Sequence, residues 1–91
     1  MSQITGMKAM SRELFEARLR EIGRSAPSSV FADVMREYAN TWGGNLDNWH
    51  EREHRERMVA ALGVVALSRF TAPTSRDELL RLKADVEATY V

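Results

Sequence analysis

The chain has 91 residues, and its 13 Lys and Arg residues balance its 13 Asp and Glu residues. A chain of this length forms one domain, residues 1–91, because single cores usually need about 50–200 residues. The balanced charge argues against a nucleic-acid binder, which needs a basic excess to displace counterions, and against an acidic mimic of DNA. The absence of cysteine excludes disulfides, thiolate metal sites and a Cys nucleophile.

The first ten residues lack the basic segment and the long apolar run of a signal peptide. The longest apolar run, Met58 to Leu67, has roughly half of the ~20 residues that a membrane span requires. We therefore expect a cytoplasmic protein that does not enter a membrane. Residues 1–10 are the candidate for a flexible N-terminal tail.

Apolar residues recur at helical spacing and no segment alternates with period two, which predicts an all-α bundle of three to four helices. The first helix is expected at about 12–22, with Ser11 as N-cap and Gly23 as its stop. The second is expected at about 30–42, after a cap at Ser28 or Ser29. Gly43 and Gly44 end it, because glycine readily adopts the left-handed conformation of a helix stop.

The third helix is predicted at about 48–69, because Asn48 and Glu51 have the spacing of a capping box. Its first half, His50 to Arg57, contains no apolar residue, whereas Met58 to Leu67 is apolar nearly all round. We therefore expect the second half to form the buried centre of the fold and the first half to be solvated or bound. The fourth helix is predicted at about 76–89, after a second capping box formed by Ser75 and Glu78.

His50, Glu51 and His54 satisfy the pattern H-E-x-x-H. On a helix, two His at i and i+4 share one face and can hold Zn²⁺, while the Glu activates a metal-bound water. The zinc proteases that this pattern resembles keep uncharged residues where this chain has Arg52, Glu53 and Arg55. We therefore expect a solvated, salt-bridged helix face, with a zinc-dependent hydrolase or metal-binding protein using His50 and His54 as the alternative.

No phosphate-binding glycine loop, nucleophile elbow or other catalytic set is present in the sequence. We therefore expect a protein that is not an enzyme and has no cofactor.

Trp42, Gly43 and Gly44 give a W-x-G between two helical halves, near the middle of a chain of about a hundred residues. This resembles the WXG100 proteins, and the resemblance implies a secreted helical hairpin that pairs as a dimer. The sequence departs from that family because Pro27 and Pro73 fall inside its two long helices, and because its C-terminal Tyr-x-x-x-acidic signal is absent. The other interpretation is that Trp42 is the last residue of the apolar, core-facing stripe of the second helix, just before the glycines that end it.

Trp49 lies near the side of the third helix that carries Val64 and Leu67. That side either packs on another helix of the chain or is exposed and adhesive. Trp49 is then a core residue or an interface anchor, since Trp, Tyr and Arg dominate binding hot spots. A bundle this small has difficulty burying both Trp49 and the apolar half of the helix, so we expect association with itself or with a partner.

The function that these observations favour is a small interaction module, such as an adaptor, a regulatory subunit or a stoichiometric inhibitor, of the kind common among phage and bacterial accessory proteins. The expected partner is a protein, a second copy of the chain as a homodimer, or both, and no nucleic acid. The candidate interface residues are Trp42, Trp49, Arg52, Glu53, Arg55 and Glu56.

Overall fold

The computed structural model describes residues 10–24, 29–43 and 45–88, apart from the side chain of Trp42. Within these ranges the chain forms helices and no strand, which confirms the all-α bundle. The elements are α1 (Arg12–Arg24), α2 (Val30–Trp42), the 3-10 turn η1 (Leu46–Asn48), α3 (Arg52–Ala66) and α4 (Pro73–Ala88). None of the described helices is both long and apolar enough to cross a membrane.

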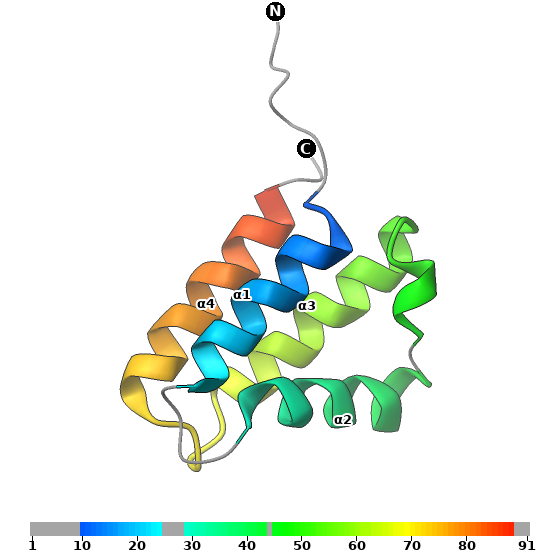
Figure 1. Cartoon of the computed structure of the whole chain (residues 1–91). Helices are drawn as coiled ribbons and strands as arrows, with labels where there is room; N and C mark the ends of the chain where they lie inside the picture. The colour runs from blue at the N-terminus through cyan, green and yellow to red at the C-terminus, as the bar shows by residue number, and fades with distance from the viewer. Residues whose placement is uncertain (1–9, 25–28, 44, 89–91) are drawn as a thin grey trace, which may run out of the picture.

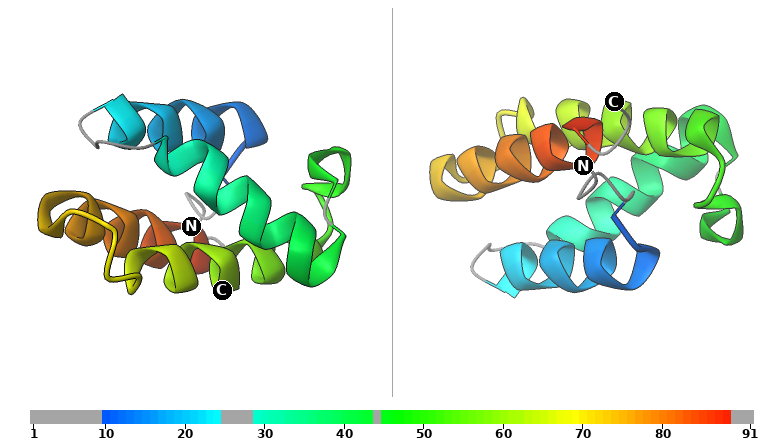
Figure 2. Two further views of the ribbon diagram at one scale, coloured as in Figure 1. Left: turned by 90° about the horizontal axis from the view of Figure 1, so that it is seen from below. Right: turned by 90° about the horizontal axis from the view of Figure 1, so that it is seen from above.

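The helices form a closed arrangement in which α3 packs on α2 and α4, and α1 packs on the same two helices from the other side. Figure 1 shows α1, α3 and α4 with a similar tilt and α2 crossing near one end of them. In Figure 2, α1 lies on one side of the α3–α4 pair, and α2 runs across from α1 to that pair. The apolar faces of all four helices therefore meet in one core.

The predicted starts of the first two helices are confirmed by their caps. The Ser11 hydroxyl accepts a hydrogen bond from the Leu14 amide at 3.1 Å, and the Ser29 hydroxyl accepts one from the Ala32 amide at 3.3 Å. Gly43 ends α2 with φ of 62°, a left-handed conformation that favours glycine. α1 runs two residues past its predicted end at residue 22, because Gly23 continues the helix instead of capping it.

The predicted third helix, 48–69, is too long at both ends. The Asn45 side chain accepts a hydrogen bond from the Asp47 amide at 2.9 Å and starts the tight turn η1, so α3 begins only at Arg52. Glu51 is its N-cap and makes no side-chain capping bond, so the capping box with Asn48 does not form. α3 ends at Ala66, whose carbonyl accepts a hydrogen bond from the Arg76 guanidinium at 3.0 Å.

The fourth helix begins three residues before its predicted start, at Pro73. Proline suits the first helical position, because its fixed φ matches the helix and its missing N–H would have no partner there. Ser75 is therefore not a cap: it lies inside the first turn, where its side chain is fully buried. Its hydroxyl has no hydrogen-bond partner within the described part of the chain. The predicted end at residue 89 lies outside the described residues.

The long helical hairpin implied by the WXG100 resemblance is not the architecture of this chain. The turn at Gly43 leads from α2 into η1, and the chain then forms two further helices. Pro73 starts α4 instead of interrupting a long helix. Pro27, residues 1–9 of the proposed tail and the Trp42 side chain lie outside the described residues.

The core draws on every helix and on the residue that follows η1. Leu62 of α3 and Leu79 of α4 are fully buried, and Tyr38 of α2 is almost so. Trp49 closes one end, with its ring centroid 4.7 Å from that of Phe15 in α1. The buried apolar residues are Phe15, Leu19, Ile22, Val30, Val34, Tyr38, Trp49, Met58, Val59, Ala61, Leu62, Val65, Ala66, Leu79, Leu82 and Val86.

The buried hydroxyl of Ser75 gives a prediction about stability. Ser75→Ala removes a polar group that lost its water on folding without gaining a partner, and alanine is the better helix former. We expect the variant to be more stable than the wild type by roughly 0.5–2 kcal/mol in urea unfolding. Thr74→Ala, at the exposed neighbouring position, is the control and should change stability by less than about 0.5 kcal/mol. A loss of stability in Ser75→Ala would contradict this assignment.

Candidate interaction surface

The two histidines of the H-E-x-x-H pattern do not share a helix face. His50 lies in the exposed turn before α3, and only His54 is inside the helix. Nδ1 of His54 lies 2.9 Å from the Tyr38 hydroxyl, and its Nε2 lies 3.4 Å from a carboxylate oxygen of Glu51. His54 thus joins α3 to α2. No group of three or more His, Cys, Asp or Glu side chains in the described ranges is placed to hold a metal ion.

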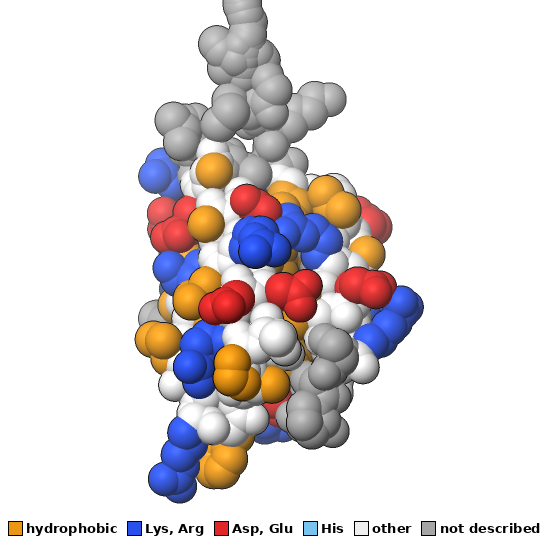
Figure 3. All heavy atoms as spheres, turned by 90° about the vertical axis from the view of Figure 1, so that its left-hand side faces the viewer, with side chains coloured by type: hydrophobic (Ala, Val, Ile, Leu, Met, Phe, Trp, Pro, Cys, Tyr) orange, Lys and Arg blue, Asp and Glu red, His pale blue; other side chains and the backbone are white. Residues whose placement is uncertain are grey.

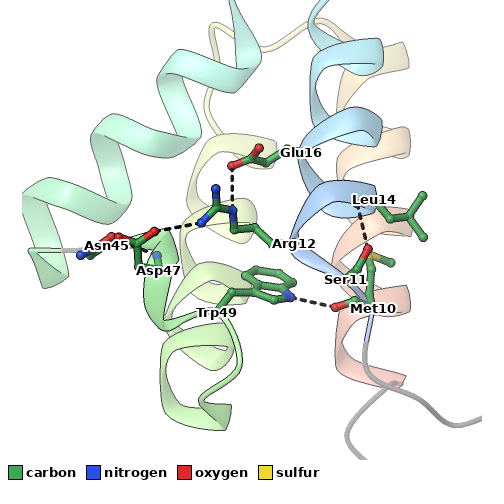
Figure 4. A network of polar contacts seen from close by, with 8 residues as sticks. All are labelled: Met10, Ser11, Arg12, Leu14, Glu16, Asn45, Asp47 and Trp49. Carbon is green, nitrogen blue, oxygen red and sulfur yellow. Dashed lines mark hydrogen bonds and ion pairs between the residues drawn. The ribbon is translucent and has the colours of Figure 1, made fainter.

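Trp49 is a core residue and not an exposed anchor. It is 7% exposed, and its indole N–H donates a hydrogen bond to the Met10 carbonyl at 2.7 Å. Figure 4 shows Trp49 beside the start of α1, with Arg12 reaching across to Asp47 of η1. Of the two alternatives left by the sequence, the structure therefore favours core packing for this residue.

Arg55 is also buried, although it falls in the half of the helix expected to be solvated. Its side chain is 8% exposed, and its guanidinium donates to the His50 carbonyl at 3.5 Å. Desolvation by burial lowers the pKa of the Arg55 guanidinium. An arginine pKa starts so high that the group stays charged at neutral pH. Arg55 therefore supports the turn before α3 from inside and is not part of an exposed rim.

The other charged candidates lie on the surface of α3, as expected. Arg52, Glu53 and Glu56 are exposed. Arg52 pairs with Glu56 at 3.3 Å, and Arg57 pairs with Glu53 at 2.6 Å. Exposed pairs of this type contribute little to stability, so this stretch is a solvated helix face.

The apolar half of α3 is not buried all round, and this corrects the expectation from the sequence. Leu62 is fully buried, whereas Val64, about 200° away around the helix, is 53% exposed. Leu67 is 73% exposed, and Phe70, in the loop after the helix, is 80% exposed. We call Glu53, Glu56, Arg57, Ala60 and Val64, together with the C-cap residue Leu67, the outward face of α3. Its C-terminal half is apolar, and Phe70 lies beyond its end.

A groove runs beside this apolar half, between α3 and α2. One cavity of about 310 Å³ lies near the end of α3, and a second of about 120 Å³ lies nearer its middle. Val64 and Glu37 border both. The residues that line this α2–α3 groove are Asp33, Arg36, Glu37, Thr41, Ala60, Ala61, Val64, Val65, Ser68 and Phe70. The smaller cavity is lined mainly by apolar surface, whereas the α2 side of the larger cavity carries charged side chains.

The interface candidates read from the sequence omit Val64, Leu67 and Phe70. The signal was present, because a helix that is apolar nearly all round cannot bury every side in a four-helix bundle. The sequence pattern favours central burial of this segment and leaves the side of Val64 and Leu67 undecided. Elsewhere the surface is mixed: on the face shown in Figure 3, basic and acidic side chains are interspersed with hydrophobic ones.

The geometry of the two histidines predicts that the protein binds no zinc stoichiometrically. His50 is outside α3, and both ring nitrogens of His54 face neighbouring side chains. We expect isothermal titration with zinc to give no saturable 1:1 binding, and His54→Ala to leave that result unchanged. His54→Ala should instead reduce stability by about 0.5–1.5 kcal/mol through the lost contact with Tyr38. Tight 1:1 zinc binding lost in both His50→Ala and His54→Ala would refute this view.

No protein-family model, curated protein or solved structure gives a significant match to this chain.

Proposed function

We propose that this protein is a small, non-enzymatic interaction module, such as an adaptor, a regulatory subunit or a stoichiometric inhibitor, that binds another protein in the cytoplasm. The observation that carries the proposal is the exposed apolar group of Val64, Leu67 and Phe70 beside the α2–α3 groove. Clustered exposed apolar side chains with a charged border are typical of protein-binding sites.

The chemistry of the groove suggests what kind of partner it accepts. Ala60, Ala61 and Val64 offer an apolar floor, and Glu37 provides a carboxylate at the border. Asp33 and Arg36 pair with each other at 2.5 Å, so their charges largely cancel. We therefore propose an amphipathic helix as the partner element, with apolar side chains at i, i+3 and i+4 and a basic residue facing Glu37.

The remaining features of the chain are compatible with this role. Equal numbers of acidic and basic residues provide no excess positive charge for nucleic-acid binding. The lack of cysteine suits a reducing compartment. No catalytic set suggests itself in the described residues, since His54 is held by Tyr38 and Glu51.

The proposal predicts that one substitution on this surface abolishes partner capture. Val64→Glu places a carboxylate in the apolar floor, where a bound partner would remove its water without offering a countercharge. We expect affinity capture from the native lysate to yield one dominant stoichiometric protein with the wild type. The yield with Val64→Glu should fall at least about tenfold, equivalent to a loss of ~1.4 kcal/mol.

Leu14→Glu is the matched control, because Leu14 on α1 is 50% exposed and Val64 is 53% exposed. The same substitution is therefore made at two equally accessible apolar positions on different faces. The control should retain the partner, and circular dichroism should show that both variants are folded. A partner held equally by Val64→Glu, or no partner for the wild type, would contradict the proposal.

A further inference from the structure

The outward face of α3 has the residue spacing of a helix that pairs with another helix. Glu53, Arg57, Ala60, Val64 and Leu67 follow one another at steps of four, three, four and three residues. This alternation averages about 3.5 residues per turn, which keeps one seam facing a partner when two helices supercoil around each other, as in a coiled coil. Within the described chain no other helix covers this seam, since α2 and α4 take the two flanks of α3. The side chains of Ala60, Val64 and Leu67 remain exposed.

The seam is complementary to itself when two copies of α3 run antiparallel. If Ala60 of one copy lies over Val64 of the other, two-fold symmetry repeats that contact on the other side of the axis. The same register places each Leu67 opposite the other copy's Arg57, whose aliphatic stem can cover it. An apolar centre is then flanked by amphipathic side chains at both ends.

The charges beside the seam fit the same register. Arg57 lies one turn after His54, which contacts Tyr38 of α2, so Arg57 is on the α2 side of the outward face. Glu37 borders the groove beside Val64, on that same side. In the antiparallel register each Arg57 faces the region of the other copy's Glu37. The chain carries no net charge, so two copies do not repel each other as whole molecules.

A stable pair would have to bury a sizeable share of this chain's surface. A typical interface buries about 800 Å² on each partner, roughly 15% of this chain's accessible surface. That accessible surface is 5464 Å², on a molecule of 43 × 27 × 19 Å. α3 contributes 15 residues along its length, and the α2–α3 groove and Phe70 widen the strip on one side.

From these observations we infer that the outward face of α3 binds a second copy of the same chain, α3 against α3 and antiparallel, when no other partner occupies it. The inference rests on the proposed function only in using the same face, and it adds self-association as the state from which a partner must displace one copy. The second copy resembles the proposed partner element, because its α3 side offers apolar Ala60, Val64 and Leu67 at steps of four and three residues, together with the basic Arg57.

The test is sedimentation equilibrium of the purified full chain from about 1 to 200 µM. We expect the mass to rise with concentration from 10.4 kDa for the monomer to twice that value. Val64→Glu should stay monomeric throughout, whereas Leu14→Glu should match the wild type. A wild type that is monomeric at 200 µM, or a Val64→Glu variant that dimerises as well as the wild type, would overturn the inference.

A charge exchange tests the register. Glu37→Arg and Arg57→Glu should each raise the dimer dissociation constant, roughly two- to thirtyfold, because each places like charges together at two symmetric contacts. The double variant should recover most of the affinity. Urea unfolding of each variant provides the control for a loss of folding. Two single variants that dimerise normally, or a double variant weaker than both, would overturn the proposed register.

A distance between two spin labels tests whether the two α3 helices run antiparallel or parallel. The chain has no cysteine, so Glu56→Cys places one spin label on each copy. In the antiparallel register the two labelled positions are offset by about 18 Å along the helix axes, which gives a total separation of about 20 Å. In a parallel pair the same positions lie side by side, about 10 Å apart. An electron–electron distance near 10 Å would overturn the antiparallel arrangement.

These results are separable from the proposed function. Sedimentation uses the purified chain alone, whereas partner capture uses the lysate. A monomeric wild type whose partner is still lost in Val64→Glu overturns the second-copy inference and leaves the proposed function standing. A dimer that Val64→Glu dissociates, in a lysate that yields no other protein, supports the inference and contradicts the proposed function.

Discussion

The packing of α3 between α2 and α4 determines which of its side chains are buried and which are exposed. A helix turns by about 100° per residue, so two flanking neighbours and the core behind them leave one strip of α3 uncovered. Leu62 falls on the core side and is fully buried, while Val64 falls in the strip and is half exposed. A segment that is apolar on every side must therefore present apolar side chains to solvent in this fold, and it does so next to a groove.

The N-terminal end of α3 is held by a different set of contacts. The Trp49 ring packs against Phe15 in a tilted arrangement, and its indole N–H donates a hydrogen bond to the Met10 carbonyl. These two contacts connect the turn before α3 to the start of α1. Arg55 supports the same turn from inside through the His50 carbonyl. Trp49 and Arg55 are buried in the core, and the surface that we propose for a partner is the outward face of α3. Its charged half is solvated, and its apolar half is where binding would remove the most apolar area from water.

The sequence allowed the fold class and one complete helix to be predicted, and the reasons for the errors are physical. α2 was predicted with both ends correct, because Ser29 and Gly43 act locally, through a cap and a left-handed stop. The helix starts predicted from Asn48 and Ser75 are wrong. Asn45 caps the turn η1 ahead of Asn48, and Pro73 starts α4 ahead of Ser75. The candidate surface was only partly predictable. Exposed charges such as Glu56 follow from composition, but the exposure of Val64 and the burial of Arg55 depend on which side of α3 each neighbour covers.

Hydroxyl-radical footprinting of the captured complex, compared with the purified chain at low concentration, can show whether a partner covers the outward face of α3. Oxidation reports how accessible each side chain is, and Leu67, Phe70 and Leu14 are all exposed in the isolated chain. We expect Leu67 and Phe70 to become protected in the complex while Leu14 is oxidised as before. Protection of Leu14 with Leu67 and Phe70 still fully reactive would show that the outward face of α3 is not the binding surface.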